Sequence, residues 1–100
     1  MLKPAAPIDS PSDPAYRVPW RLDRRRAPRF ELRNVSGERL IAFTLAVLGP
    51  GTLIWGLPTA VEAGAAVHFT LRAENPARGT VVVVRWSRPN GDEYLWRVSF

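Results

Sequence analysis

The chain has 100 residues, enough for one small domain, and its formal net charge is +5. It contains no cysteine, which excludes disulfides, thiolate metal sites and a cysteine nucleophile. His68 is its one histidine, so a histidine-rich metal centre is excluded as well. The beginning of the chain lacks the long apolar core of a secretory signal, and we therefore expect a cytoplasmic protein.

Residues 1–23 are rich in proline and predict a flexible, disordered N-terminal tail. Six of the ten prolines precede the first expected strand, and each removes a backbone donor and disfavours helix before it. Tyr16, Val18 and Trp20 interrupt the polar character of this segment. Their docking on the folded part and their binding to another protein are both open. We expect the folded domain to cover residues 24–100.

A basic run follows the tail and reads Arg24-Arg25-Arg26-Ala27-Pro28-Arg29-Phe30. Such a block attracts phosphates through its long-range field and through forked hydrogen bonds. Arg25 and Arg29 stand four residues apart on a segment that Pro28 stiffens, so both can approach one anion. A guanidinium also pairs with the O6 and N7 edge of guanine. A solvated linker is the alternative interpretation of the same charges.

Alternating apolar and polar residues predict six strands and no helix downstream of the basic run. The expected strands cover residues 29–35, 39–48, 52–57, 66–72, 80–87 and 93–100. Turn residues separate them, and Asn90-Gly91 is a strong hairpin signal. Short strands at this spacing indicate an all-β antiparallel barrel or sandwich. In the second strand we expect the bulkier set to face inward, namely Ile41, Phe43, Leu45 and Val47.

The stretch from Leu40 to Val61 has no charged residue and is long enough to cross a bilayer as a helix. Gly49-Pro50-Gly51 lies in its middle and would break such a helix where lipid offers no replacement partners. Two apolar strands forming a hairpin around this turn explain the same residues better. We therefore expect no membrane span.

Some apolar residues are expected on outward strand faces. If Val82 and Val84 point inward, Val81 and Val83 point outward, and Leu48 is outward by the same alternation. Outward apolar side chains need a cover. We therefore expect a protein partner, a second copy of the chain or the tail to lie against Leu48, Val81 and Val83.

No pattern in the sequence predicts catalysis. Serines and acids are present, but no histidine or lysine lies near them in sequence to activate a nucleophile. Gly49-Pro50-Gly51 lacks the lysine and threonine of a phosphate loop. We expect no enzyme activity, no metal and no cofactor.

The basic run and the strands after it resemble the PilZ domain family. The similarity lies in Arg25-Arg26-Ala27-Pro28-Arg29-Phe30, in residues 57–71 and in the closing Tyr94-Leu95-Trp96-Arg97-Val98-Ser99-Phe100. The resemblance implies a six-stranded antiparallel β-barrel. It also implies a sensor or adaptor in bacterial second-messenger signalling, whose ligand is cyclic di-GMP.

The family carries two ligand motifs. Arg25 and Arg29 match the first, R-x-x-x-R, and by resemblance they would contact guanine and phosphate, with Arg26 assisting. The second, [D/N]-x-S-x-x-G, falls on residues 46–51, where only Gly51 matches because Ala46 and Leu48 replace the polar positions. Two missing polar contacts would weaken binding by roughly ten- to several-hundred-fold.

These departures leave alternative functions open. A degenerate PilZ domain that binds protein instead of nucleotide is the second hypothesis. A small basic barrel that binds nucleic acid through its phosphates is the third. We rank it last because no outward strand face offers an aromatic stacking platform, and we expect no nucleic-acid partner.

Overall fold

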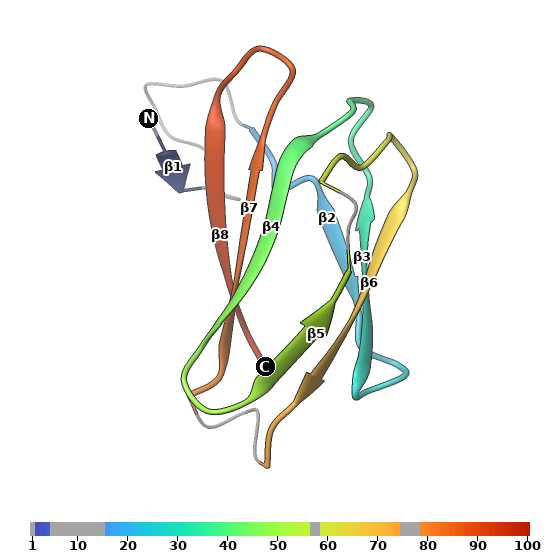
Figure 1. The fold of residues 1–100 in the computed structure, drawn as a ribbon. Coiled ribbons are helices and arrows are strands. Elements are labelled where there is room, and N and C mark those ends of the chain that lie inside the picture. Colours follow the sequence, from blue (N-terminus) through green and yellow to red (C-terminus); the bar gives the residue numbers. More distant parts are fainter. Residues whose placement is uncertain (1, 5–15, 57–58, 75–78) are drawn as a thin grey trace.

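The computed structural model describes residues 2–4, 16–56, 59–74 and 79–100, and this part of the chain is all-β (Figure 1). Its strands are β1 (Leu2–Pro4), β2 (Trp20–Asp23), β3 (Arg29–Asn34), β4 (Ile41–Leu48), β5 (Thr52–Trp55), β6 (Ala66–Arg72), β7 (Val81–Ser87) and β8 (Glu93–Ser99). They form two four-stranded sheets, ordered β1-β8-β7-β4 and β2-β3-β6-β5. All pairings are antiparallel except that of β1 with β8.

The core lies between the two sheets, as the alternation of apolar residues predicts. Phe30 and Leu32 of β3 are buried beside their cross-strand partners on β6, Phe69 and Val67. Trp86 of β7 and Trp20 of β2 bring the sheets together through an edge-to-face contact at 5.9 Å between ring centroids. The expected inward positions of Val82 and Val84 in β7 are confirmed, because both are buried. Position 57 and residues 75–78, within an expected strand and an expected turn, lie outside the described residues.

The expected hairpin between the second and third predicted strands is wrong. β4 pairs with β7 and β5 pairs with β6, so the turn over residues 49–51 carries the chain from one sheet to the other (Figure 1). In the described part of the chain no strand ladder joins β4 to β5, and the six-stranded closed barrel is replaced by two facing sheets. An isolated bridge between Leu40 and Val61 links the segments near β4 and β6.

The described residues of the long uncharged stretch therefore form strands and the loops that connect them. Within the described residues, no helix has the length and apolar character that crossing a membrane requires. The connecting turn is held by tight packing: Gly49 has φ of 87°, and a Cβ on it would lie 2.2 Å from the carbonyl oxygen of Gly79. The buried Thr80 hydroxyl donates to the Pro50 carbonyl at 2.7 Å. These contacts explain why the turn needs glycine.

The expected inward face of β4 needs one correction. Phe43 and Leu45 are buried as expected, but Leu40 is fully buried while Ile41 is only half-buried. The register with β7 shifts between Ile41 and Thr44, and Ala42 in this irregularity has φ of 52°. A bulge of this kind inserts a residue and inverts the alternation on its N-terminal side.

The folded region begins before residue 24, contrary to the expected boundary. β2 lies inside the expected tail, and its Trp20 is 5% exposed. Tyr16 also docks on the folded part, where its ring lies 4.4 Å from that of Tyr94 and its hydroxyl accepts a hydrogen bond from Trp86 Nε1 at 3.0 Å. Arg88 stacks over the same ring at 4.4 Å. Residues 1 and 5–15 of the expected tail lie outside the described part.

The outward apolar residues also differ from expectation. Leu48 is 47% exposed, as expected, and Val81, its cross-strand partner, is half-buried. Val83 is only 7% exposed although its neighbours Val82 and Val84 supply the core cluster on the other face. Val83 is therefore not part of an exposed apolar surface.

Candidate functional site

The β2–β3 hairpin folds the basic run back on itself. Antiparallel pairing sets Arg21 opposite Arg33 and Asp23 opposite Glu31. Both pairs lie on the outer face of the sheet, because Leu22 and Leu32 alternate with them toward the core. Like charges directly opposite each other destabilise a strand pair, so this arrangement depends on contacts that neutralise the acids.

The turn between the two strands carries Arg24, Arg25 and Arg26, and Arg29 begins β3 directly after it. Two backbone hydrogen bonds define it, Ala27 N–H to Arg24 O at 3.4 Å and Arg29 N–H to Arg26 O at 2.9 Å. The Pro28 carbonyl accepts a third from Leu71 N–H at 3.0 Å, which ties the turn to β6. Arg25, Arg26 and Arg29 are all exposed. Among the described residues, the side chains of Arg26 and Arg29 make no hydrogen bond or ion pair.

Arg25, in contrast, is bound to Asp23. Its Nη2 lies 2.8 Å from Asp23 Oδ2, and its Nε lies 3.1 Å from Oδ1 and 3.2 Å from Oδ2. The backbone N–H of Arg25 donates to Oδ1 at 2.9 Å. These side-chain and backbone hydrogen bonds lower the pKa of Asp23 from 3.8 to about 2, and the same pairing raises the pKa of Arg25.

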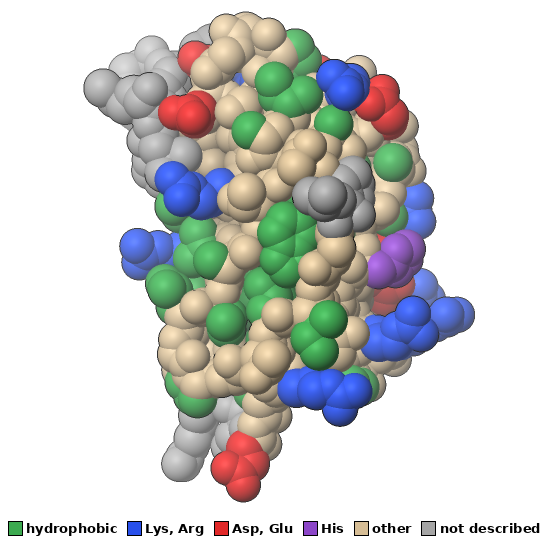
Figure 2. Space-filling view, viewed as in Figure 1, with side chains coloured by type: hydrophobic (Ala, Val, Ile, Leu, Met, Phe, Trp, Pro, Cys, Tyr) green, Lys and Arg blue, Asp and Glu red, His purple; other side chains and the backbone are tan. Residues whose placement is uncertain are grey.

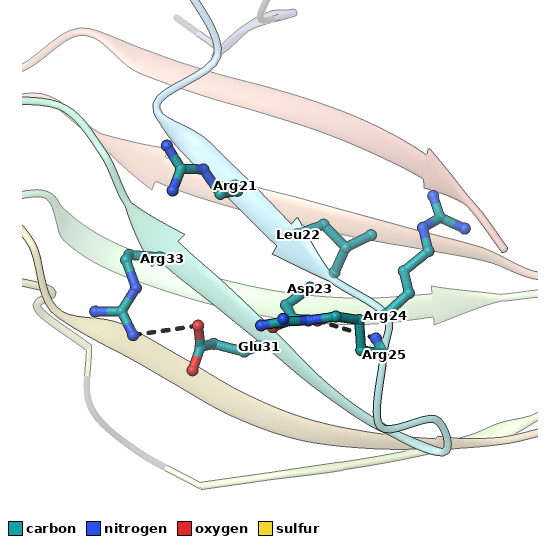
Figure 3. Close-up of a pocket in the computed structure, with 7 residues that line it drawn as sticks. All are labelled: Arg21, Leu22, Asp23, Arg24, Arg25, Glu31 and Arg33. Carbon is teal, nitrogen blue, oxygen red and sulfur yellow. Dashed lines mark hydrogen bonds and ion pairs between the residues drawn. The ribbon is translucent and has the colours of Figure 1, made fainter.

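A groove of about 560 Å³ lies along the β2–β3 hairpin (Figure 3). Its lining consists of Arg21, Leu22, Asp23, Arg24, Arg25, Glu31 and Arg33. Four arginines face two carboxylates, so the charged lining has a net charge of +2. The groove therefore favours an anionic occupant.

Two of the groove's arginines are also held by the protein. Arg24 Nη2 donates to the Ser99 carbonyl at 3.2 Å, and its guanidinium lies 5.0 Å from the centre of the Phe100 ring. Arg33 donates to Gly64 O at 2.7 Å and to Glu31 at 3.2 Å. Arg21 is exposed and has no hydrogen bond or ion pair among the described residues.

His68 lies on the surface, as the alternation of β6 predicts. Its Nε2 is 3.1 Å from Glu31 Oε1, and its side chain is 67% exposed. Figure 2 shows several arginine side chains near the histidine, on the β3–β6 side of the molecule. His68 thus borders the basic surface and has the environment of an exposed strand residue.

Gly51 is the remaining predicted site residue. It lies near the C-terminal end of β6, the end that the β2–β3 turn also contacts, but on the opposite edge of that strand. Pro28 contacts Leu71 from the β3 side, while Thr52, next to Gly51, pairs with Arg72 from the β5 side. Two interstrand spacings, about 10 Å, separate such positions. Gly51 has φ of 135°, which favours glycine for the turn itself. It does not line the groove described above.

The second motif offers no polar side chain to a ligand, because Ala46 and Leu48 occupy its polar positions. Ala46 and Leu48 are both exposed on the outer face of the β4–β7 pair. Asn34 and Ser36, which have the spacing of the first two polar positions of that motif, have a structural role instead. Asn34 is fully buried, and its amide donates to Glu38 O at 2.8 Å and to Val61 O at 3.0 Å.

Together these features define a two-sheet, all-β protein with a basic groove and an arginine-bearing turn on one sheet. No protein-family model and no curated protein matches the sequence.

Charge and spacing in the sequence predict Arg25, Arg26 and Arg29 as ligand residues. Of these three, Arg25 lines the groove, and the acids of the groove are not predicted. Asp23 falls within the expected flexible tail and Glu31 within the expected strand over residues 29–35, so neither is predicted as a site residue. A usable signal was present for Asp23, because aspartate before a turn commonly accepts a hydrogen bond from the backbone two residues ahead. The pairing of Arg21 with Arg33 follows only once the hairpin register is known.

Proposed function

We propose that this protein is a receptor for an anionic guanine nucleotide, cyclic di-GMP in the first instance, which binds at the turn between β2 and β3. The observation that carries the proposal is the fixed turn with its junction to β3, where Arg25, Arg26 and Arg29 are all exposed to solvent. Guanidinium groups make forked pairs with phosphate and with the O6 and N7 edge of guanine. Arg25 and Arg29 are the principal ligand contacts in this proposal.

Two further features support a nucleotide at this place. The lining of the adjacent groove has a surplus of positive charge, which raises the local concentration of anions. The turn at Gly51 reaches the same end of β6, so backbone groups there are available to a ligand that spans β6. The resemblance to PilZ domains supplies the choice of cyclic di-GMP, with a sensor or adaptor role in signalling.

Isothermal titration calorimetry with cyclic di-GMP tests the proposal. We expect binding heat with the wild-type protein and its loss in Arg25→Ala/Arg29→Ala. A matched control is Arg85→Ala/Arg97→Ala. Arg85 on β7 and Arg97 on β8 are both exposed on the outer face of their sheet, and this double substitution removes the same amount of positive charge. Absence of heat with the wild type, or equal weakening by both double variants, contradicts the proposal.

A protein-binding function is the second candidate, and the exposure of apolar residues favours it. Leu48 and Ile54 are 47% and 55% exposed, on β4 and β5 respectively, which are the edge strands of the two sheets. Figure 2 also shows apolar side chains on the face where β4 and β5 lie. Leu48→Asp should abolish concentration-dependent association in analytical ultracentrifugation, whereas Arg25→Ala should leave it unchanged. Association unaffected by Leu48→Asp would reject this candidate.

A further inference from the structure

Arg25 is already occupied in the free protein. Its Nε and Nη2 atoms both donate to the Asp23 carboxylate, at distances between 2.8 and 3.2 Å. The arginine side chain is 87% exposed, whereas that of Asp23 is 27% exposed. A ligand that binds the Arg25 guanidinium must therefore first displace the Asp23 carboxylate from it.

The contact has the geometry of anion recognition. The planar edge of a guanidinium donates two N–H hydrogen bonds to two oxygens of a carboxylate or of a phosphate in the same forked arrangement. The Asp23 carboxylate oxygens accordingly mark where two oxygens of an external anion would lie. We propose that Asp23 is a built-in stand-in for a ligand phosphate, and that a phosphate group entering the groove displaces its carboxylate from Arg25.

The surroundings of the pair suit such an exchange. Arg21 and Arg24 lie on the same groove, so an anion that reaches Arg25 meets additional positive charge (Figure 3). Asp23 Oδ1 also accepts the backbone N–H of Arg25, and that bond does not require the guanidinium. Asp23 therefore keeps one partner when the side chain of Arg25 turns to a ligand, and the turn keeps its shape.

This inference rests on the proposed function for the identity of the ligand, but its chemistry requires only a phosphate group. Inorganic pyrophosphate is therefore the first probe, and cyclic di-GMP is the second. The informative variant is Asp23→Asn, because an asparagine side chain still accepts the Arg25 backbone N–H but no longer carries the competing charge.

We expect Asp23→Asn to bind pyrophosphate about two- to fivefold more tightly than the wild type, the range for losing a competing exposed ion pair. The matched control is Glu62→Gln. It removes one carboxylate from the exposed pair with Arg39, which does not line the groove. Glu62→Gln should leave the affinity for pyrophosphate close to that of the wild type.

A double-mutant cycle separates displacement from a general change in charge. In an Arg25→Ala background the Asp23→Asn substitution should no longer raise the affinity, because the two residues act on one contact. A second readout is the carboxyl resonance of Asp23 followed by NMR against pH. Saturating pyrophosphate should raise the pKa of Asp23 from about 2 toward its ordinary value of 3.8, since it loses the guanidinium.

Each arm has an outcome that overturns the inference. Equal or weaker pyrophosphate binding by Asp23→Asn, the same gain in the Arg25→Ala background, or no pyrophosphate binding by either protein would each do so. Failure of the proposed function looks different. In that case wild type and Asp23→Asn give no heat with cyclic di-GMP, while the pyrophosphate arm still shows the gain.

Discussion

The indole Nε1–H of Trp86 donates a hydrogen bond to the Tyr16 hydroxyl at 3.0 Å, across 70 positions of sequence. Trp86 is 1% exposed, so its N–H depends on this acceptor. Burial raises the pKa of Tyr16, which keeps its hydroxyl protonated well above neutral pH. This hydrogen bond thereby adds to the ring contacts that hold Tyr16, four residues before β2, against the core.

We predict that Tyr16→Phe destabilises the fold by about 1–3 kcal/mol, because it leaves a buried donor without a partner while keeping the ring contacts. Urea denaturation measures this as a lower midpoint at an unchanged slope. Tyr16→Leu should cost more, since it also removes the ring that packs against Tyr94 and Arg88. A midpoint equal to that of the wild type for Tyr16→Phe would show that the hydrogen bond is dispensable.

A comparison of Gly49 with Gly64 tests the close packing of Gly49 in the turn between the sheets. Both have positive φ, 87° and 81°, but a Cβ on Gly64 would enter open space, whereas one on Gly49 would meet the Gly79 carbonyl. Gly64→Ala should cost about 1–2 kcal/mol, the left-handed penalty alone. Gly49→Ala should cost clearly more, because backbone must also move. Similar losses in thermal denaturation for the two variants would contradict the close approach.

Asn34 should be the most sensitive polar residue of the core. Its amide donates to carbonyls of Glu38, Val61 and Glu62, and its Oδ1 accepts from the Ser36 hydroxyl at 2.7 Å. Asn34→Ala leaves these groups without their partner and should cost roughly 3 kcal/mol or more. The exposed Asn90, whose Oδ1 accepts from Asp92 N–H, is the control, and Asn90→Ala should cost less than about 1 kcal/mol.

The Asp23–Arg25 pair predicts a defined pH dependence. Because the pKa of Asp23 is lowered on folding, its contribution to stability is fully present above about 3.8 and is lost as pH falls through about 2. The difference in melting temperature between wild type and Asp23→Asn should therefore be constant at neutral pH and vanish below pH 2. A difference that persists in strong acid would show that the substitution acts through something other than the charge.

The regular strands could be predicted closely from sequence, and their partners could not. The strand over residues 66–72 was predicted with its observed bounds, because Val67, Phe69 and Leu71 alternate without interruption. β2 was missed because only Trp20 and Leu22 signal it, between prolines and arginines. The inverted phase at Leu40 depends on a bulge whose residue, Ala42, is not one that favours positive φ.

The site shows the same division. The arginines of the turn were predicted because charge and spacing are visible in one dimension. The capture of Arg25 by Asp23 depends on how the turn directs two side chains two residues apart, and the groove depends on the register of β2 with β3. A charge pattern in the sequence reveals neither the direction of these two side chains nor the register of the two strands.

The crossing of the chain between sheets at residues 49–51 bears on how the protein folds during synthesis. β4 and β5 are adjacent in sequence but pair with β7 and β6, which are made later. β4 and β5 therefore cannot complete their hydrogen bonds with each other when they leave the ribosome. Long-range pairing of this kind slows folding and leaves apolar strands exposed until their partners arrive. We expect newly made chains to depend on chaperones until β7 has been synthesised.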